Sequence, residues 1–150
     1  MARAAVQRQG GDASANIPYR RRSRRPPVIL IADDTTDTRE LYVDHFSRRG
    51  FAVVTAHDGA AAVRVALDHV PDVIVMDLAM PQIDGITALR RIKADARTAR
   101  TRVILLTGYP HKAVERGALN AGADRFLTKP CLPEDLERHV KELQRPRRSA

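Results

Sequence analysis

The stretch that decides the fold reads Val73-Ile74-Val75-Met76-Asp77-Leu78-Ala79-Met80-Pro81-Gln82-Ile83-Asp84-Gly85. Its first four residues are all apolar, without alternation, which is typical of a strand buried on both faces of a parallel sheet. Asp77 ends this run, and an unpaired carboxylate is costly to bury. We therefore place Asp77 at the carboxyl end of a strand, facing water, at the edge where open α/β sheets bind ligands. Pro81 and the pair Asp84-Gly85 predict a loop before the next helix.

Length and composition predict one cytoplasmic domain. The 150 residues, 43% of them hydrophobic, are enough for a single domain with its own core. The single cysteine, Cys131, excludes an internal disulfide and fits a reducing compartment. No apolar run approaches the ~20 residues that span a bilayer, and no apolar segment typical of a secretory signal follows the basic N-terminus. We expect no transmembrane segment.

The net charge of +8 is concentrated in the two terminal segments. Residues 1–26 carry seven arginines and one aspartate, and residues 144–150 carry three arginines and no acid, so residues 27–143 have a net charge of −1. We predict a disordered basic arm over 1–26, a folded domain over 27–143 and a basic C-terminal tail over 144–150. The arm is suited to nucleic acid, an anionic membrane or an acidic partner, or it is only a solvated tail.

Strand and helix patterns alternate along the folded domain. We predict strands at 28–32, 51–56, 73–77, 103–108 and 125–129, and helices at about 36–49, 58–70, 85–94, 111–121 and 133–143. Thr35 or Thr36 is the expected cap of the first helix and Asp58 that of the second. Such alternation requires right-handed crossovers with helices on both faces of a parallel sheet. The predicted class is therefore α/β, a flavodoxin-like doubly wound parallel sheet of five strands in the order 2-1-3-4-5, with five helices.

This strand order predicts a reactive site. The first and third strands are neighbours, so Asp33, Asp34 and Asp77 converge at the carboxyl edge, beside Thr107 and Lys129 from the last two strands. Three such carboxylates repel one another unless a cation intervenes. Mg²⁺ needs only one or two carboxylates, together with water and phosphate oxygens. A phosphoryl group on Asp77 would have the metal, the lysine and the threonine hydroxyl around it, which suits phosphoryl transfer.

With these motifs in order, residues 27–143 resemble the receiver domain of two-component response regulators. The resemblance rests on Asp33-Asp34, the segment from Met76 to Pro81 with Asp84-Gly85, Leu106-Thr107-Gly108, Gly122-Ala123 and Lys129-Pro130. It implies that Asp77 is the phosphoacceptor, and that a sensor histidine kinase or a histidine phosphotransfer protein supplies the phosphoryl group. It also implies that the chain is not an enzyme, although it assists its own phosphorylation and dephosphorylation.

The resemblance assigns further roles residue by residue. Asp33, Asp34, Asp77 and the backbone carbonyl of Ala79 are the implied Mg²⁺ ligands. Thr107 and Phe126 resemble the switch pair that responds to phosphorylation. Lys129 resembles the lysine of the site, which a cis proline follows in this family.

The output is expected to be a docking surface. The last predicted helix ends at about residue 143 and only a short tail follows, so the chain resembles a single-domain response regulator. By analogy with the family, its downstream protein target binds the fourth helix, fifth strand and fifth helix, roughly residues 111–143. The alternative is a nucleic-acid-associated regulator that uses the arm 1–26 as its output.

Overall fold

The structure, a computed structural model, describes residues 25–145. The predicted disorder of residues 1–24 and the last five residues of the predicted tail lie outside this range. The division into an arm, a domain and a tail stays a prediction.

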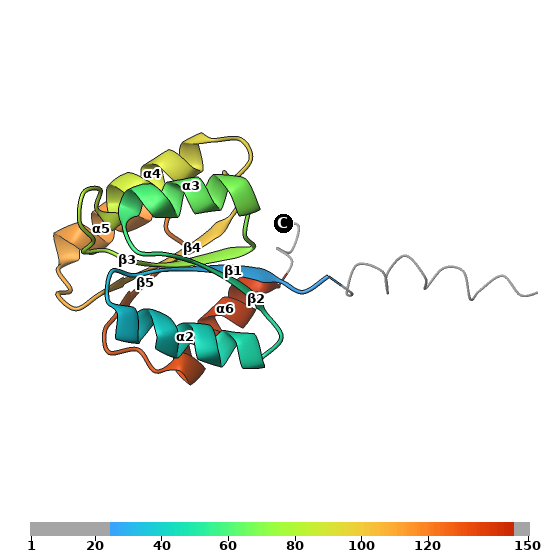
Figure 1. Ribbon diagram of the computed structural model, residues 1–150. Coiled ribbons are helices and arrows are strands. Elements are labelled where there is room, and N and C mark those ends of the chain that lie inside the picture. Colours follow the sequence, from blue (N-terminus) through green and yellow to red (C-terminus); the bar gives the residue numbers. More distant parts are fainter. Residues whose placement is uncertain (1–24, 146–150) are drawn as a thin grey trace, which may run out of the picture.

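Five parallel strands form one sheet with helices on both faces (Figure 1). The strands are β1 (Val28–Ala32), β2 (Ala52–Ala56), β3 (Val73–Asp77), β4 (Arg102–Thr107) and β5 (Arg125–Thr128). The helices are α2 (Thr36–Arg48), α3 (Gly59–His69), α4 (Gly85–Ala94), α5 (Lys112–Asn120) and α6 (Pro133–Gln144). The strand order β2-β1-β3-β4-β5 confirms the predicted fold class, and the predicted elements are displaced by no more than two residues at their ends.

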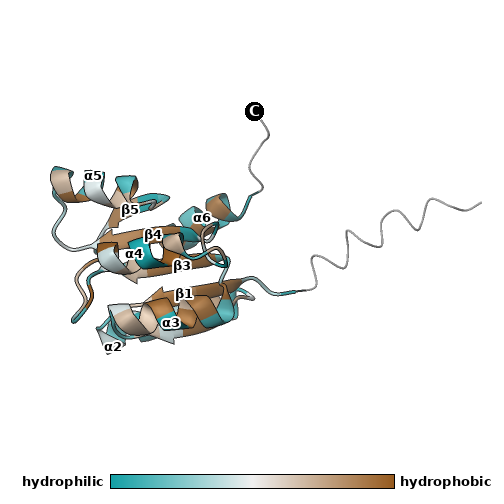
Figure 2. Cartoon of the chain, turned by 90° about the horizontal axis from the view of Figure 1, so that it is seen from above, coloured by the Kyte–Doolittle hydropathy of each residue, from teal (hydrophilic) through white to brown (hydrophobic). Residues whose placement is uncertain are grey.

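The core lies in two layers, one on each side of the sheet. α2 and α6 cover one face, while α3, α4 and α5 cover the other (Figure 1). Successive residues of β3 point to opposite faces, so Ile74 belongs to one layer and Val75 to the other. All five residues of β3 are buried, and the central strands are hydrophobic along most of their length (Figure 2). This explains why the sequence of the central strand shows no polar alternation.

Two of the predicted helix caps behave differently. The Asp58 carboxylate accepts a hydrogen bond from the backbone N–H of Ala61 at 2.7 Å, which confirms the cap of α3. Thr35 occupies the N-cap position of α2, but its side chain makes no capping hydrogen bond. Its backbone N–H instead donates to Asp33 Oδ1 at 2.8 Å. The expectation of a threonine side-chain cap is therefore wrong, because the turn is organised around the aspartate.

The start of α3 packs directly against the loop between β3 and α4. A Cβ atom added to Gly59 would overlap the backbone carbonyl of Ile83. Because this contact is with backbone atoms and not with the flexible end of a side chain, it could be relieved only by moving the chain. Asp84, next in sequence, caps α4 by accepting from the N–H of Thr87 at 2.8 Å. The absence of a side chain at Gly59 therefore fixes how closely α3 approaches the loop that follows Asp77.

We expect Gly59→Ala to destabilise the fold by about 1–3 kcal/mol, since overpacking against backbone forces the loop to move. The matched control is Gly117→Ala, in the interior of α5, where an added Cβ would meet nothing within 4 Å. That change should stabilise the protein by about 0.5–1 kcal/mol, because glycine is a poor helix former. Urea unfolding of the wild type and the two variants measures both values, provided that the slope of unfolding free energy against urea concentration is the same in all three. Equal effects of the two substitutions would contradict the close approach.

Candidate functional site

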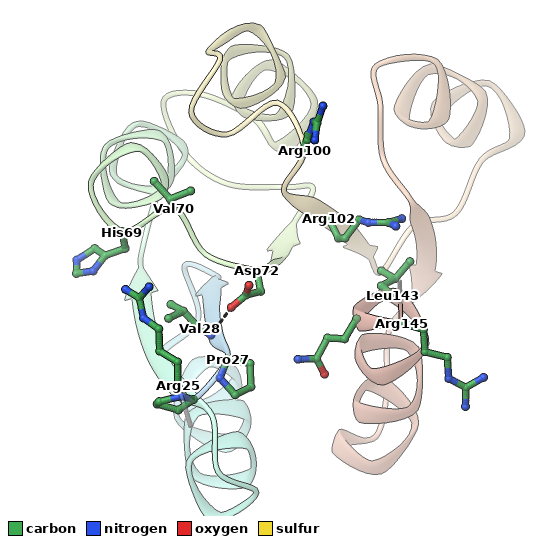
Figure 3. Close-up of a pocket in the computed structure, with 12 residues that line it drawn as sticks. Arg25, Pro27, Val28, His69, Val70, Asp72, Arg100, Arg102, Leu143 and Arg145 are labelled. Atoms are coloured by element: carbon green, nitrogen blue, oxygen red, sulfur yellow. Dashed lines mark hydrogen bonds between the residues drawn. The ribbon is translucent and has the colours of Figure 1, made fainter. Parts of the chain in front are cut away.

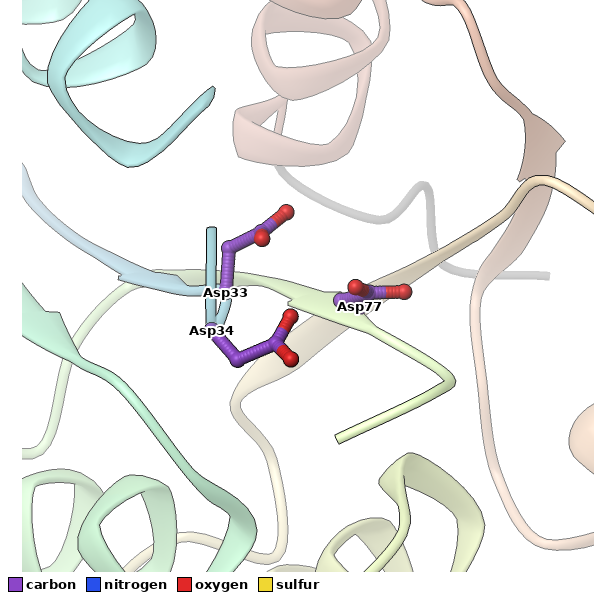
Figure 4. A group of neighbouring side chains, drawn as sticks. All are labelled: Asp33, Asp34 and Asp77. Atoms are coloured by element: carbon purple, nitrogen blue, oxygen red, sulfur yellow. The ribbon is translucent and has the colours of Figure 1, made fainter. Parts of the chain in front are cut away.

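Three carboxylates meet at the carboxyl edge of the sheet. β1 and β3 are hydrogen-bonded neighbours with Ala32 opposite Met76, so the residues that follow these two lie side by side. Oxygen atoms of Asp33, Asp34 and Asp77 all lie within 4.8 Å of one another (Figure 4). The convergence predicted from strand order is confirmed.

The burial of this cluster differs from the prediction. Asp77 is 6% exposed and Asp33 is 2% exposed, while Asp34 is exposed. The expectation that Asp77 faces water is therefore wrong. Its burial is tolerated because both of its oxygens are hydrogen-bonded. Oδ1 accepts from the backbone N–H of Ala79 at 3.1 Å, and Oδ2 accepts from Lys129 Nζ at 3.2 Å.

Lys129 joins two of the carboxylates. Its ammonium group also donates to Asp33 Oδ2 at 2.9 Å, so one cation bridges the ends of β1 and β3. Burial alone would lower the pKa of Lys129, but the hydrogen bonds and charges of Asp33 and Asp77 outweigh burial and raise it. Burial raises the pKa of Asp77, which the charge of Lys129 and the Ala79 N–H only partly oppose. The lysine is held as a cation within a site that carries excess negative charge.

The predicted switch residues lie on neighbouring strands. Thr107 ends β4 and is 3% exposed, and its hydroxyl oxygen accepts from the N–H of Tyr109 at 3.1 Å. Phe126, on β5 opposite Leu105, is partly buried against the core layer under α3, α4 and α5. The backbone carbonyl of Thr107 accepts from the N–H of Lys129 at 2.7 Å. The end of β4 is thus tied directly to the lysine of the site.

Two contacts that sequence reasoning missed hold the site from α2. The Tyr42 hydroxyl donates to the backbone carbonyl of Cys131 at 2.7 Å, two residues beyond Lys129. Arg39 Nη1 donates to the carbonyl of Asp33 at 2.7 Å. The Lys129-Pro130 peptide bond is cis, as the resemblance implied. In the sequence, Tyr42 is recognisable only as part of the apolar stripe of a helix. The hydrogen bond of its hydroxyl group could therefore not be predicted.

The donor set suits a hard divalent cation. The three carboxylates supply only oxygen atoms, which Mg²⁺ prefers, and their three negative charges exceed the single charge of Lys129. The Asp34 side chain makes no hydrogen bond or ion pair with any residue from 25 to 145. Its oxygens are therefore available to a metal ion without breaking a protein contact.

Family comparison identifies the class of protein that this fold and site define. The family model of the response regulator receiver domain matches residues 29–141. The chemotaxis protein CheY of Bacillus subtilis is 40% identical over 103 residues, covering 68% of this chain and 84% of that protein. The chain belongs to the response regulator receiver domain family of two-component systems, in which phosphorylation on aspartate is general.

Other relatives differ in length. The chain is 32% identical over 117 residues to the probable transcriptional regulator ycf27 of Guillardia theta, covering 78% of this chain but only 45% of that protein. The chain therefore spans less than half of that relative. The receiver domain of a sensor histidine kinase from Pseudomonas aeruginosa PAO1 is 28% identical, with a TM-score of 0.73 over 80% of this chain and 98% of that chain. Its crystal structure holds a magnesium ion coordinated in the active-site cleft.

A membrane-spanning helix was not expected from the sequence. Between residues 25 and 145, no helix has both the length and the apolar character needed to cross a bilayer.

Neutralising Asp34 should stabilise the metal-free fold. Asp34→Asn removes a charge that lies near two other carboxylates and has no partner in the described part of the chain. At this separation the relief of repulsion is on the order of 1 kcal/mol. Urea unfolding in the presence of a chelator measures it, and added salt should reduce the difference by screening. Clear destabilisation without metal would contradict a repulsive cluster.

Loss of the Tyr42 hydroxyl should destabilise the fold in a pH-dependent way. Tyr42→Phe deprives the Cys131 carbonyl of its donor, at a cost of about 1 kcal/mol. Burial raises the pKa of Tyr42 to about 12, so the folded state keeps a proton that the unfolded state loses near pH 10. This contribution is complete below about pH 10 and is lost as pH rises toward 12.

Urea unfolding of wild type and Tyr42→Phe from pH 8 to 11 tests this dependence. The advantage of the wild type should shrink above pH 10. The control is Tyr109→Phe, because the Tyr109 side chain is 86% exposed and its removal should leave the pH dependence unchanged. A difference between wild type and Tyr42→Phe that stayed constant over this range would contradict the assignment.

Proposed function

We propose that this chain acts as a stand-alone receiver that takes a phosphoryl group on Asp77, in a Mg²⁺-dependent reaction, from a histidine kinase or a histidine phosphotransfer protein. The observation that carries this proposal is the pair of bonds from Lys129 Nζ to Asp33 and Asp77. They place a fixed cation beside Asp77, and Asp34 offers free carboxylate oxygens beside the same residue.

The transfer exchanges one bond to phosphorus for another. A carboxylate oxygen of Asp77 bonds to the phosphorus as the bond from phosphorus to the donor imidazole nitrogen breaks, and that nitrogen keeps the electron pair. Lys129 is positioned to move from carboxylate oxygens to the phosphoryl oxygens, where it stabilises charge spread over the transferred group. Asp33, Asp34, Asp77 and the carbonyl of Ala79 would hold Mg²⁺, which neutralises phosphoryl charge when bound.

Phosphorylation is proposed to change a docking surface through Thr107 and Phe126. Thr107 would donate its hydroxyl proton to the phosphoryl group, and Phe126 would turn inward behind it. Phe126 is part of β5 and Thr107 lies opposite Thr128 of β5, so both adjoin the surface of α5, β5 and α6. On this surface, Leu119 of α5 and Leu132, the N-cap of α6, are 45% and 60% exposed. Exposed apolar side chains of this size support a protein target, because apolar contacts form the centre of most interfaces.

The chain is proposed to be a phosphoacceptor rather than an enzyme with a separate substrate, although it assists its own phosphorylation and dephosphorylation. The proposal that it acts alone rests on its match to 84% of the length of the Bacillus subtilis chemotaxis protein. A cytoplasmic location is proposed from the family and from the single cysteine.

A second candidate function is that of a nucleic-acid-associated regulator. The division of charge favours it, because residues 1–26 and 144–150 carry ten arginines while residues 27–143 are close to neutral. This proposal does not exclude phosphorylation, since the two functions use different parts of the chain.

Asp77 should be the sole phosphoacceptor. With acetyl phosphate and Mg²⁺, intact-mass spectrometry should find one phosphoryl group on the wild type and none on Asp77→Asn. Lys129 contacts both Asp33 and Asp77, but only Asp77 matches the phosphoacceptor position of the family, whereas Asp33 matches an implied metal ligand. The control Asp68→Asn changes an exposed carboxylate of α3 and should leave incorporation unchanged. Equal incorporation in wild type and Asp77→Asn would refute the assignment.

A further inference from the structure

A hollow of about 770 Å³ lies at the amino edge of the sheet, at the opposite end of the strands from Asp77. It is bordered by the beginning of β1 and the ends of α3 and α6 (Figure 3). Its charged and titratable lining residues are Arg25, His69, Asp72, Arg100, Arg102 and Arg145. Sequence reasoning gave this edge no role.

Three of these arginines form no ion pair within the described part of the chain. Arg25, Arg100 and Arg145 are exposed, and their guanidinium groups make no ion pair with any residue from 25 to 145. Arg102 differs, because it is half-buried and bonds Asp124 at 3.2 Å. Figure 3 shows Arg25 and Arg100 on different sides of the opening. The free positive charges therefore come from different parts of the rim.

Asp72, the one acidic group among the described lining residues, does not neutralise them. Asp72 Oδ2 accepts from the backbone N–H of Val28 at 2.8 Å (Figure 3), so this carboxylate ties the start of β1 to the turn before β3. The described lining thus holds three guanidinium groups without an ion pair in the described range, and one carboxylate that already has a backbone donor. The hollow thus has a net positive charge within a folded domain that is close to neutral.

Further arginines precede Arg25 and follow Arg145 in the sequence. Four precede Arg25 within five residues, and two follow Arg145 within three residues. The described chain begins at Arg25 and ends at Arg145, and both residues line the hollow. The two arginine-rich terminal segments are therefore joined to the folded domain at the same basic hollow.

The chemistry of the lining selects the kind of partner. A guanidinium group can donate two parallel hydrogen bonds to two oxygens of one phosphate. Among the described residues, no Phe, Tyr or Trp lines the hollow, so it lacks the large aromatic side chains on which the successive bases of a single strand stack. Among the described lining residues, Val70 is the only exposed large apolar one, which is too little for insertion into a membrane. The phosphates of a double helix need neither stacking nor insertion.

We propose that this basic hollow binds the phosphate backbone of duplex nucleic acid without reading its sequence. The binding extends the second candidate function from the basic arm to the folded domain. It is independent of phosphate uptake by Asp77, since the hollow and the acidic cluster lie at opposite edges of the sheet.

The test uses the full chain with fluorescently labelled 20-base-pair duplexes of DNA and of RNA, and measures anisotropy at several salt concentrations. Arg100→Ala combined with Arg145→Ala should weaken binding several-fold. It should also reduce the slope of log affinity against log salt by about 2, one for each lost phosphate contact. The measurements with DNA and with RNA show which duplex is preferred, and the same effect of the double substitution on either duplex supports the proposal.

The matched control is Arg64→Ala combined with Arg90→Ala, which removes the same charge from exposed positions outside the hollow. Its affinity and salt slope should equal those of the wild type. Equal losses in the two double variants would overturn the proposal, as would unchanged binding after loss of Arg100 and Arg145. Binding to phosphatidylserine vesicles but to neither duplex would also overturn it. Phosphate uptake from acetyl phosphate should be unchanged in both variants, which verifies that each is folded.

Discussion

The bridge from Lys129 to Asp33 and Asp77 is the interaction on which the candidate site depends. A parallel sheet brings the carboxyl ends of β1 and β3 together, and both strands continue into aspartates. Two buried carboxylates side by side would be strongly unfavourable without a cation. The single positive charge of the lysine bridges two of the three carboxylates and leaves Asp34 without a partner in the described range. The site is therefore partly neutralised, which holds its geometry and still favours a further cation.

The fold was predictable because its signals are local. An apolar run such as the one ending at Asp77, repeated between capped or amphipathic helices, admits few topologies once crossovers are right-handed. Burial of the aspartate was not predictable in the same way. A carboxylate at a strand end is exposed or covered according to what packs above it, and here the covering comes from residues far along the chain. The hydrogen bond from the Thr35 N–H to Asp33 likewise takes the place of the expected threonine cap. No spacing rule predicts this contact.

The candidate site residues were also predictable, since strand order alone brings Asp33, Asp77 and Lys129 to one edge. Their supports were not. The Tyr42 hydroxyl bonds a backbone carbonyl 89 residues away, and any residue type can present such a carbonyl, so the pairing leaves no pattern in the sequence. The basic hollow escaped prediction for a related reason. Its free arginines belong to three separate segments, and their shared surface exists only after the chain has folded.

The two charged edges follow from one property of the sheet. Because all five strands are parallel, every carboxyl end lies on the acidic side and every amino end on the side of the hollow. A five-residue strand such as β3 separates these edges by roughly 16 Å, more than the ~8 Å over which charges act at physiological salt. A phosphoryl group on Asp77 therefore has little direct electrostatic effect on the hollow. Any influence between the two edges must pass through the packed helices that border both.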